Sequence, residues 1–548
     1  MRHTLPKKLQ NFPHNLNNFE KGLFWVFTTW GTYFLYIWPK MLFRTSAGIF
    51  SGWVNIWGDF AAHFSYSTPF LYNPPSTWLT HHPLYIESKF TYPFAADAIS
   101  GILARFGLDI VWAFVLPSIV FSLLLLYMVY KFTYVFTKSA LVSYLNLTAF
   151  LTSGGLGFLW LFAQLKKDPT LILNTEYTNM KAVGIDWINT ITSEVLPQRA
   201  FLIGVPITLI IILIINNWYK TKFKDVSVLK VVLVGFLSSS LVFIHVHSLI
   251  VLVFVSAIYF LYSLKYFKWW VIYAVSSAIS LVPVYLYLYK TQITQSFFKW
   301  YPGWMANPNA LDKNIFYFWF LNWGLFIPIF IFAYFYKRFY KNPLASAAIV
   351  IFTVANLILF QPHNWDNSKI LSYAFLFMGV FVCSFLKELF NKNLLFKAAV
   401  VIMILTFTLS GALDIARLFD HKNHINLMYS QSDLILADNL NSMINPGDVV
   451  LTSDKHDHWV TNLTKAQILL GYKGWLWTYG IDYQQVYQDT ITIFSASPSA
   501  ENLIDKYNIQ YVVIGPLALK EYKANKNYFE SKYPIVLSNQ DYSVYKVR

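Results

Sequence analysis

Acidic and histidine side chains gather between residues 57 and 97, just after the first long apolar segment of the chain. Asp59 and His63 open this stretch, and their spacing places both side chains on one face if the segment is helical. A carboxylate beside an imidazole can remove the proton from a hydroxyl group. We therefore predict that Asp59 is a general base and that His63 either orients it or is the alternative base.

The aromatic residues around Asp59 separate two interpretations of this acid. One is that Asp59 is a solvated loop residue at the end of a span. However, Trp53, Trp57 and Tyr66 indicate a helix that lies in the membrane interface, with its polar face directed towards the other spans rather than towards bulk water. Ionisable groups held near a membrane usually have a partner or a task, so we favour a functional Asp59.

The same stretch continues with further polar residues among prolines and aromatic residues. His82 precedes Pro83, so the two could simply form a turn, and Asp97 could pair with Arg105. Imidazole and carboxylate groups in such a loop can also bind the hydroxyl groups of a ligand. We keep His82 and Glu87 as candidate substrate-binding residues on this basis.

Two other segments supply basic side chains that could hold an anionic group. Arg199 begins a long apolar run. It is either an interfacial anchor whose charge reaches water or a phosphate clamp, because a guanidinium presents a planar fork of donors. His245 and His247 lie between two apolar runs. They are either buried hydrogen-bonded side chains or phosphate ligands; metal is a third interpretation, but two ligands alone do not make a site.

The segment QPHNWDNSK, residues 361–369, lies between two more apolar runs. Its His363, Asp366 and Lys369 would be costly so near a membrane without partners. Lys369 could pair with Asp366 or bind an anionic ligand. All three are therefore candidate substrate-binding residues.

Apolar helices are the elements that must position these groups. The chain has 548 residues, of which 56% are hydrophobic and 13% charged, a composition typical of multi-spanning membrane proteins. Runs long enough to cross a bilayer, about 17–25 residues, occur near 23–43, 111–130, 139–163, 200–219, 229–244, 248–264, 269–289, 316–336, 344–360, 368–386 and 397–413. The predicted fold is an all-α polytopic membrane bundle of about eleven transmembrane helices.

The net charge of +15 is distributed as short basic clusters between the apolar runs, which argues against a nucleic-acid partner. Lysine-rich connections alternate with connections that carry the acids and histidines. The positive-inside rule places the lysine-rich set and the N-terminus in the cytoplasm. An odd number of spans then places the C-terminal segment outside a multi-pass cell-membrane protein.

The composition becomes more polar from residue 414 onwards. Strands are predicted at 448–453, 467–472, 510–515 and 542–547, and helices at 430–444 and 501–508. Strands that alternate with helices favour a small α/β domain. We predict a transmembrane domain over 1–413, with its first outer loop at 44–110, and an extracytoplasmic α/β domain over 414–548.

The chain resembles the glycosyltransferase C superfamily, in particular a poorly characterised prokaryotic branch related to oligosaccharyltransferases, protein O-mannosyltransferases and aminoarabinose transferases. The motifs that carry the resemblance are WGDFAAHF, TYPFAAD, LPQRAFLIG, QPHNWDNSK and GYKGWLWTYGIDY. They are spread over nearly the whole chain. Several members carry paired acids in the first loop, whereas Phe60 follows Asp59 here. A divalent metal is therefore possible but not supported, and no cofactor is assigned.

The resemblance implies transfer of a sugar from a polyprenyl-phosphate-linked donor to an extracytoplasmic hydroxyl acceptor on a glycan, lipid or protein. Asp59 would accept the hydroxyl proton, and basic groups would neutralise the departing phosphate, where negative charge develops. Membrane lipid would surround the donor's tail. Aromatic rings such as Trp304 and Trp475 could stack on sugar faces.

The alternative is a transporter or flippase for a lipid-linked or anionic solute. Transporters often contain inverted repeats and carry charges at mid-membrane. Here the charged groups collect at one face, and the sequence has no evident repeat. These two features favour the transferase.

Overall fold

The computed structural model describes the chain except for residues 1–15, 225, 291–297 and 421–422. Lys7 and Lys8, which contribute to the charge pattern, lie outside the described residues. The chain divides into two compact units. Among described residues, the first contains 16–38, 118–278 and 298–420, and the second contains 39–117, 279–290 and 423–548.

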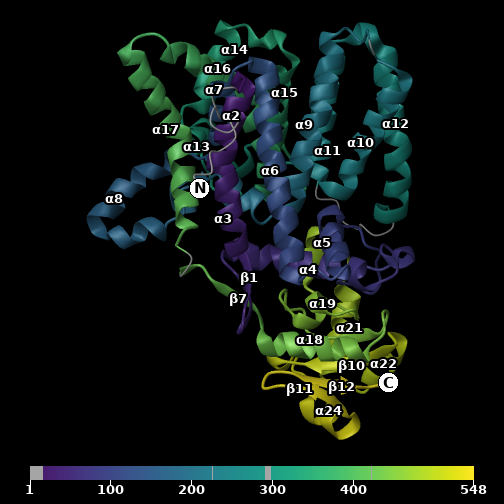
Figure 1. The fold of residues 1–548 in the computed structure, drawn as a ribbon. Helices are drawn as coiled ribbons and strands as arrows, with labels where there is room; N and C mark the ends of the chain where they lie inside the picture. Colours follow the sequence, from purple (N-terminus) through teal and green to yellow (C-terminus); the bar gives the residue numbers. More distant parts are fainter. Residues whose placement is uncertain (1–15, 225, 291–297, 421–422) are drawn as a thin grey trace, which may run out of the picture. The chain divides into compact units, whose positions relative to one another are not determined.

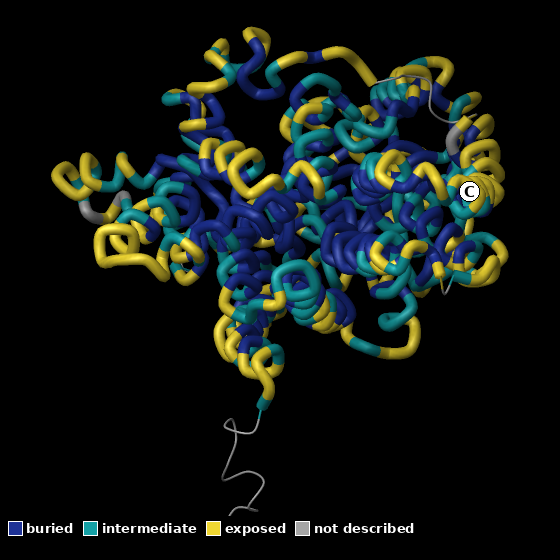
Figure 2. The backbone as a smooth tube through the Cα atoms, turned by 90° about the horizontal axis from the view of Figure 1, so that it is seen from above, coloured by how far each residue is buried: buried dark blue, intermediate teal, exposed yellow. Residues whose placement is uncertain are grey.

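The first unit is a bundle of apolar helices (Figure 1). The helix α16 (Ser368–Phe390) is buried along most of its length. Partly exposed helices surround such buried segments, as the burial colouring of Figure 2 shows. The other helices that lie wholly or largely in this unit are α2 (Asn18–Val26), α3 (Thr32–Met41), α6 (Ile110–Thr137), α7 (Ala140–Leu151), α8 (Leu159–Lys167), α9 (Arg199–Lys220), α10 (Val228–Ile244), α11 (Val246–Leu261), α12 (Phe267–Val284), α13 (Ile315–Trp323), α14 (Phe326–Tyr336), α15 (Pro343–Leu357) and α17 (Leu394–Arg417).

Among the described residues, five helices are long and apolar enough to cross a membrane, or up to seven if each of two bent pairs forms one span. Three shorter apolar helices, α10, α11 and α15, accompany them. The chain is thus a multi-pass membrane protein. All eleven predicted runs are largely helical, but the number of spans stays a prediction.

The two bent pairs meet at glycines. The axis turns by 68° between α7 and α8 and by 100° between α13 and α14. Gly324 lies at the second bend with a φ of +55°, and a Cβ there would be 2.3 Å from the carbonyl oxygen of Thr406. At the first bend, a Cβ on Gly155 would be 2.0 Å from the carbonyl oxygen of Leu321. Glycine is therefore required at both bends by the close approach of other backbone segments.

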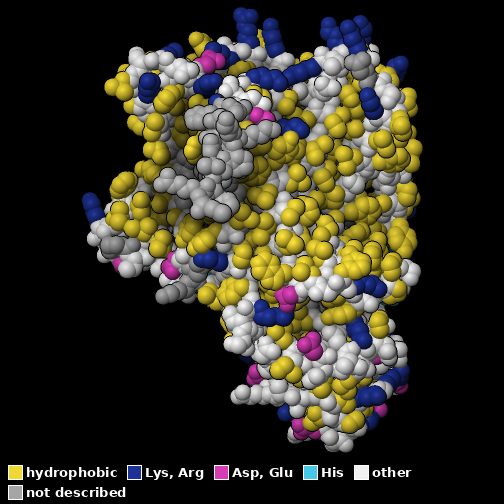
Figure 3. Space-filling model, in the orientation of Figure 1, with side chains coloured by type: hydrophobic (Ala, Val, Ile, Leu, Met, Phe, Trp, Pro, Cys, Tyr) yellow, Lys and Arg dark blue, Asp and Glu magenta, His cyan; other side chains and the backbone are white. Residues whose placement is uncertain are grey.

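Basic side chains gather at one end of the helical bundle, at the top of the view in Figure 3. Figure 1 draws α14 at this end, and the turn after α14 exposes Lys337, Arg338 and Lys341. The clustering agrees with the alternation of basic and polar connections expected from the sequence. Which side of the membrane this end faces stays a prediction.

The second unit begins with a hairpin that follows the first apolar run. Its strands β1 (Leu42–Thr45) and β2 (Gly48–Ser51) pair antiparallel, and β2 also pairs antiparallel with β7 (Asn426–Ser430), which follows the last apolar run. The hairpin leads into α4 (Val54–Tyr72), and α5 (Ala95–Arg105) follows a loop. Residues 44–110 and the tail thus share one sheet.

A five-stranded sheet forms the rest of this unit, in the order β11-β12-β10-β8-β9. β10 and β9 pair parallel with β8, and β12 pairs antiparallel with β10 and β11. Each predicted strand overlaps an observed one, and both predicted helices are present, whereas β7 and β11 were not predicted. The elements are β8 (Val449–Leu451), β9 (Gln467–Ile468), β10 (Ile509–Ile514), β11 (Ile535–Ser538), β12 (Ser543–Lys546), α18 (Gln431–Met443), α19 (Trp459–Leu463), α20 (Lys473–Thr478), α21 (Gln484–Phe494), α22 (Ala500–Lys506), α23 (Pro516–Glu521) and α24 (Lys526–Lys532).

A glycine allows α5 to pack closely against α4. A Cβ on Gly101 would be 2.5 Å from the carbonyl oxygen of Ser67 and 2.8 Å from the Cβ of Phe70. Since one of these neighbours is backbone, an added methyl group would push the two helices apart. The contact matters because α4 and α5 carry Asp59, His63 and Asp97.

We predict that Gly101→Ala lowers the free energy of unfolding by about 1–3 kcal/mol through this overpacking. Gly58→Ala is the matched control, because Gly58 lies within α4 and no atom approaches its Cβ position within 4 Å. In that helix interior alanine should be neutral or stabilise by about 0.5–1 kcal/mol. Thermal unfolding of both variants in detergent measures the difference, and equal midpoints would contradict the close packing of α4 and α5.

Candidate functional site

The helix α4 confirms that Asp59 and His63 lie one turn apart on one helix. His63 is buried, and its Nδ1 is 3.0 Å from Oδ1 and 3.2 Å from Oδ2 of Asp97. The side chain of Asp97 is 0% exposed and lies in the first turn of α5, whereas Asp59 is partly exposed. The structure thus pairs Asp97 with His63. Arg105, the neighbour considered from the sequence, instead donates a hydrogen bond to the main-chain carbonyl of Asn73.

Two phenols, one buried and one partly buried, lie near these carboxylates. The hydroxyl groups of Tyr66 in α4 and Tyr479 after α20 are 3.2 Å apart. Burial raises the pKa of both phenols well above the ordinary value, and the negative charges of Asp59 and Asp97 raise them further. Both tyrosines are therefore neutral O–H donors near the two acids. Sequence reasoning missed Tyr479 as a neighbour of this site, because it lies in the tail.

Two of the other first-loop candidates have different surroundings. His82 is buried against the rings of Tyr66 and Phe90, and its Nδ1 accepts a hydrogen bond from the main-chain N–H of Leu84 at 3.1 Å. Burial lowers the pKa of His82 to about 3, so this side chain is neutral. Glu87 is exposed. The placement of His82 favours a packing role, and the role of Glu87 in binding stays a prediction.

Trp475 lies in α20, close to the loop that follows β8. Its ring centroid is 5.0 Å from that of Tyr472 and 6.2 Å from that of His456. His456 in turn contacts Trp57 of α4 edge-to-face, with ring centroids 4.3 Å apart. Trp475 is partly exposed, and its stacking on a sugar stays a prediction.

In the first unit, Arg199 is the first residue of α9 and is 3% exposed. It is buried rather than extended to water, which disfavours the anchor interpretation. Glu194, in the helical turn Thr190–Val195 just before α9, is also buried and accepts a hydrogen bond from the hydroxyl of Ser368 at 2.6 Å. Sequence reasoning passed over Glu194, although its position between polar residues near a span is the signal that selected Arg199.

His245 lies at the break between α10 and α11, outside both helices. Its Nδ1 is 2.7 Å from the hydroxyl of Ser248, and that hydroxyl bonds the phenol of Tyr373. Burial and then the charge of Lys369 lower the pKa of His245 to about 3. The neutral imidazole can donate a hydrogen bond to an anion but adds no positive charge to it. His247 bonds the side chain of Gln361.

The segment 361–369 places its polar residues at the start of α16. Lys369 is 3.0 Å from Asp366, and both side chains are partly exposed. The structure therefore confirms one of the two predicted arrangements, an ion pair between these residues. His363 is exposed, at the start of the short helix Asn364–Asn367.

Trp304 occupies the core of the first unit. It is 0% exposed, its ring stacks on that of Trp319 with centroids 5.5 Å apart, and its indole N–H donates to the carbonyl of Asn364 at 2.6 Å. A sugar could stack on this ring only after the core had opened. The placement favours packing over the predicted role in substrate binding.

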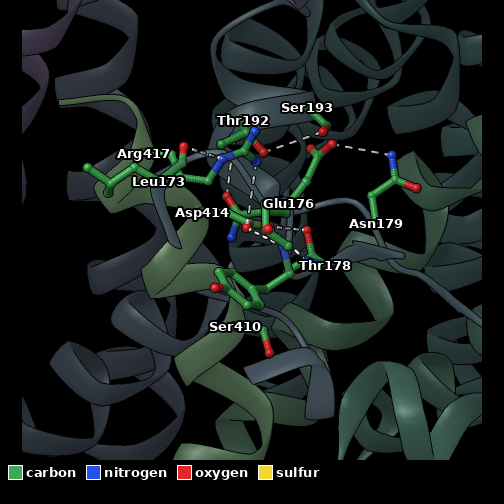
Figure 4. A network of polar contacts seen from close by, with 12 residues as sticks. Leu173, Glu176, Thr178, Asn179, Thr192, Ser193, Ser410, Asp414 and Arg417 are labelled. Carbon is green, nitrogen blue, oxygen red and sulfur yellow. Dashed lines mark hydrogen bonds and ion pairs between the residues drawn. The ribbon is translucent and has the colours of Figure 1, made fainter. Parts of the chain in front are cut away.

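A polar network at the end of α17 fixes the segment that leads to Arg199 (Figure 4). Asp414 accepts hydrogen bonds from the main-chain N–H groups of Tyr177 and Thr178, at 2.6 and 3.0 Å, and from the hydroxyl of Thr178. Arg417 contacts Asp414 at 3.9 Å and donates to the carbonyl of Leu173. These contacts serve to hold the loop in place.

The same loop buries an acid that sequence reasoning missed. Asp186 ends the short strand β4 (Ile185–Asp186) and is 1% exposed. Among the residues that the structure describes, neither of its carboxylate oxygens has a hydrogen-bond partner. Burial raises its pKa to about 6, with Glu176 adding to the rise and Lys181 opposing it. Buried charged groups are normally paired. No spacing pattern in the sequence could have revealed this lone acid.

The two units thus hold two groups of candidates. Asp59, His63 and Asp97 meet in the second unit, while Arg199, His245 and Lys369 lie at the beginnings of α9, α11 and α16, which are neighbouring helices. Among the described residues, no three or more His, Cys, Asp or Glu side chains are arranged to hold a metal ion.

Comparison with solved structures finds two enzymes that align with most of this chain. The oligosaccharyltransferase of Archaeoglobus fulgidus, tethered with an acceptor peptide, is 12% identical with a TM-score of 0.45, over 90% of this chain and 69% of that chain. The same enzyme in complex with Zn and sulfate is 12% identical with a TM-score of 0.46, and the alignment covers 91% of this chain and 68% of that chain. ArnT from Cupriavidus metallidurans in the apo state is 10% identical with a TM-score of 0.49, and the alignment covers 94% of this chain and 98% of that chain.

The superfamily that the motif resemblance implies stays a prediction. No family model matches the chain, and no curated protein matches it in sequence. Similarities at this level assign no role to any residue of this chain.

We predict that Asp186→Asn raises the thermal midpoint at pH 7.5 and raises it much less at pH 4.5. The raised pKa means that the folded chain holds the proton more tightly than the unfolded chain. Wild-type stability should therefore fall as the pH rises from about 4 to 6, by at most about 3 kcal/mol. Asparagine does not ionise, so the variant avoids this loss of stability. Thermal unfolding at both pH values checks this.

The matched control for Asp186 is Asp541→Asn, which alters an exposed acid. Its difference from wild type should stay within about 0.5 kcal/mol at both pH values. A difference between Asp186→Asn and wild type that is the same at pH 4.5 and 7.5 would show that Asp186 does not titrate between them.

Proposed function

We propose that the chain is an integral membrane glycosyltransferase that moves a sugar from a polyprenyl-phosphate-linked donor to an extracytoplasmic hydroxyl acceptor. The observation that carries the proposal is the surroundings of Asp59. This partly exposed acid lies one turn from the buried pair of His63 and Asp97, and neutral tyrosine hydroxyls lie beside it. A carboxylate placed in this way suits a general base in hydroxyl transfer.

Asp59 accepts the proton of the acceptor hydroxyl as its oxygen attacks the anomeric carbon of the donor sugar. The bond between that carbon and the phosphate oxygen breaks, and the electron pair leaves with the phosphate. A partly exposed position lets an acceptor approach Asp59, while the adjoining hydrophobic core limits access by water. The acceptor is a glycan, lipid or protein that carries a hydroxyl group.

The leaving phosphate requires positive charge and hydrogen-bond donors. Arg199 at the start of α9 and Lys369 near the start of α16 provide the charge, with help from the helix N-termini, where unpaired N–H groups favour anions. His245 contributes as a neutral donor. The first turn of α11 also carries His247, and the segment just before α16 carries His363 and Asp366. Asp366 forms an ion pair with Lys369, which a bound phosphate replaces.

The orientation in the membrane follows from the basic connections. We assign the lysine-rich turns and the N-terminus to the cytoplasm, and the second unit's tail to the extracytoplasmic side. The catalytic groups then face the compartment in which the acceptor is found. Apolar surfaces of the spans accommodate the polyprenyl tail, which is soluble only in lipid.

We predict that Asp59→Asn lowers the rate of sugar transfer by about 10³-fold or more, because the amide cannot accept the hydroxyl proton. The measurement incubates purified protein with a panel of polyprenyl-phosphate sugars and membrane acceptors and quantifies the polyprenyl phosphate released. Expression level and detergent extraction should match wild type.

Asp541→Asn is the matched control for this experiment, because it removes an exposed acid from a turn of the tail. It should transfer at the wild-type rate. Near-normal turnover by Asp59→Asn would remove Asp59 from the mechanism, and a wild-type protein that releases no polyprenyl phosphate from any donor would overturn the proposed function itself.

We predict that Arg199→Gln lowers kcat/KM for the lipid-linked donor by about 10²-fold, through loss of a charged donor to the phosphate, with little change in KM for the acceptor. Arg338→Gln is the control, since Arg338 is exposed in the turn after α14. Steady-state kinetics with each substrate varied in turn measure both constants. An unchanged kcat/KM for the donor would exclude Arg199 from phosphate binding.

One observation favours the alternative of a transporter or flippase. Two helix pairs are sharply bent, and broken helices often form the substrate sites of transporters. The release assay separates the two functions, because transport leaves the bond between sugar and phosphate intact. Movement of intact donor across proteoliposomes, without released polyprenyl phosphate, would support the alternative.

A further inference from the structure

We propose that Asp97 is a positioning residue that acts through His63, and that the two together form the relay that takes the proton onwards from Asp59. The inference rests on the proposed function and concerns the same site. The observation behind it is the fully buried contact in which both oxygens of Asp97 lie within 3.0–3.2 Å of Nδ1 of His63.

The contact fixes the state of the imidazole ring. An ionised carboxylate can only accept hydrogen bonds, so the His63 nitrogen that faces Asp97 carries a proton. In the neutral ring, Nε2 is then the basic nitrogen. A carboxylate that holds a histidine in one tautomer and orientation also stabilises the imidazolium ion when the ring gains a second proton.

The surrounding structure holds Asp97 in place. Asp97 lies in the first turn of α5, where the helix dipole favours a negative side chain. Its helix packs on α4 through Gly101, and the ring of Tyr92, a few residues before α5, stacks on Tyr66 of α4 with centroids 4.3 Å apart. Contacts on both sides of Asp97 therefore keep its carboxylate on His63.

The proton can be followed through one turnover. It leaves the acceptor hydroxyl for the carboxylate of Asp59 as the new glycosidic bond forms. Asp59 lies one helical turn from His63, a spacing that brings side chains together, and passes the proton to Nε2. The imidazolium is stabilised by the negative charge of Asp97, which is not itself protonated, and releases the proton to water. Asp59 is then ionised for the next acceptor.

Burial alone does not explain the pair. Buried ion pairs often contribute little net stability, because removing the charges from water costs about as much as their attraction returns. A purely structural pair could be replaced without a specific effect on the chemical step. A double-mutant cycle distinguishes the two roles, since residues that act as one unit show losses that do not add.

The experiment measures kcat and both KM values for wild type, Asp97→Asn, His63→Gln and the double variant. Asparagine keeps an oxygen that can accept from Nδ1 but removes the charge. We expect Asp97→Asn to lower kcat about 30-fold with both KM values within about twofold. The double variant should match His63→Gln within about twofold, and Asp97→Glu should restore part of kcat, because it returns a carboxylate.

Asp489→Asn is the matched control, because Asp489 is another buried acid of the same unit. It accepts hydrogen bonds from Tyr507 at 2.6 Å, Lys506 at 2.9 Å and Gln485 at 2.9 Å. Its loss should lower the thermal midpoint and leave kcat unchanged. Thermal unfolding of every variant shows whether the protein is folded, and Asp97→Glu keeps the comparison available if Asp97→Asn does not fold.

Losses in kcat that multiply in the double variant would overturn the relay, because Asp97 and His63 would then act independently. A kcat of Asp97→Asn close to wild type would overturn it as well. Both outcomes leave the proposed function standing, since wild type is active in them. Wild type that transfers no sugar would overturn the proposed function, and the relay with it.

Discussion

The candidate base depends on one hydrophobic core that α4 shares with the tail sheet inside the second unit. Tyr66 and Phe70 of α4 are buried in the same core as Leu451 of β8 and Val512 of β10. Asp59 lies on the same face of α4 as these two rings, nearer the start of the helix. Burying each ring is worth about 1.5–3 kcal/mol, so α4 cannot rotate about its axis. The direction of Asp59 is therefore set by apolar packing.

That core also explains why residues 44–110 and the tail form one compact unit. The antiparallel contact of β2 with β7 joins the chain just after the first apolar run to the chain just after the last one. Tyr85 of the loop bridges Leu470 of the tail. A loop anchored by both a sheet and a core keeps the spacing of α4 and α5, which is what the contact between His63 and Asp97 requires.

The sequence predicted what depends on neighbouring residues and failed where distant segments meet. Apolar runs predicted the helices because hydropathy is local, and the spacing of Asp59 and His63 predicted their shared face. The pairing of β2 with β7 joins segments from the two ends of the chain, so no local pattern could reveal it. Asp97 was visible in the sequence, but its partner was not. Asp186 gave no signal, because only the fold buries it.

The histidines show why residue type alone did not assign roles. His82 accepts from a main-chain N–H, and burial keeps it neutral; His245 is neutral for the same reason beside a serine hydroxyl. Neither can balance a phosphate charge. His63 instead faces a buried carboxylate, which fixes the orientation of its ring. Among the candidates for a charged phosphate contact, Arg199 and Lys369 therefore remain.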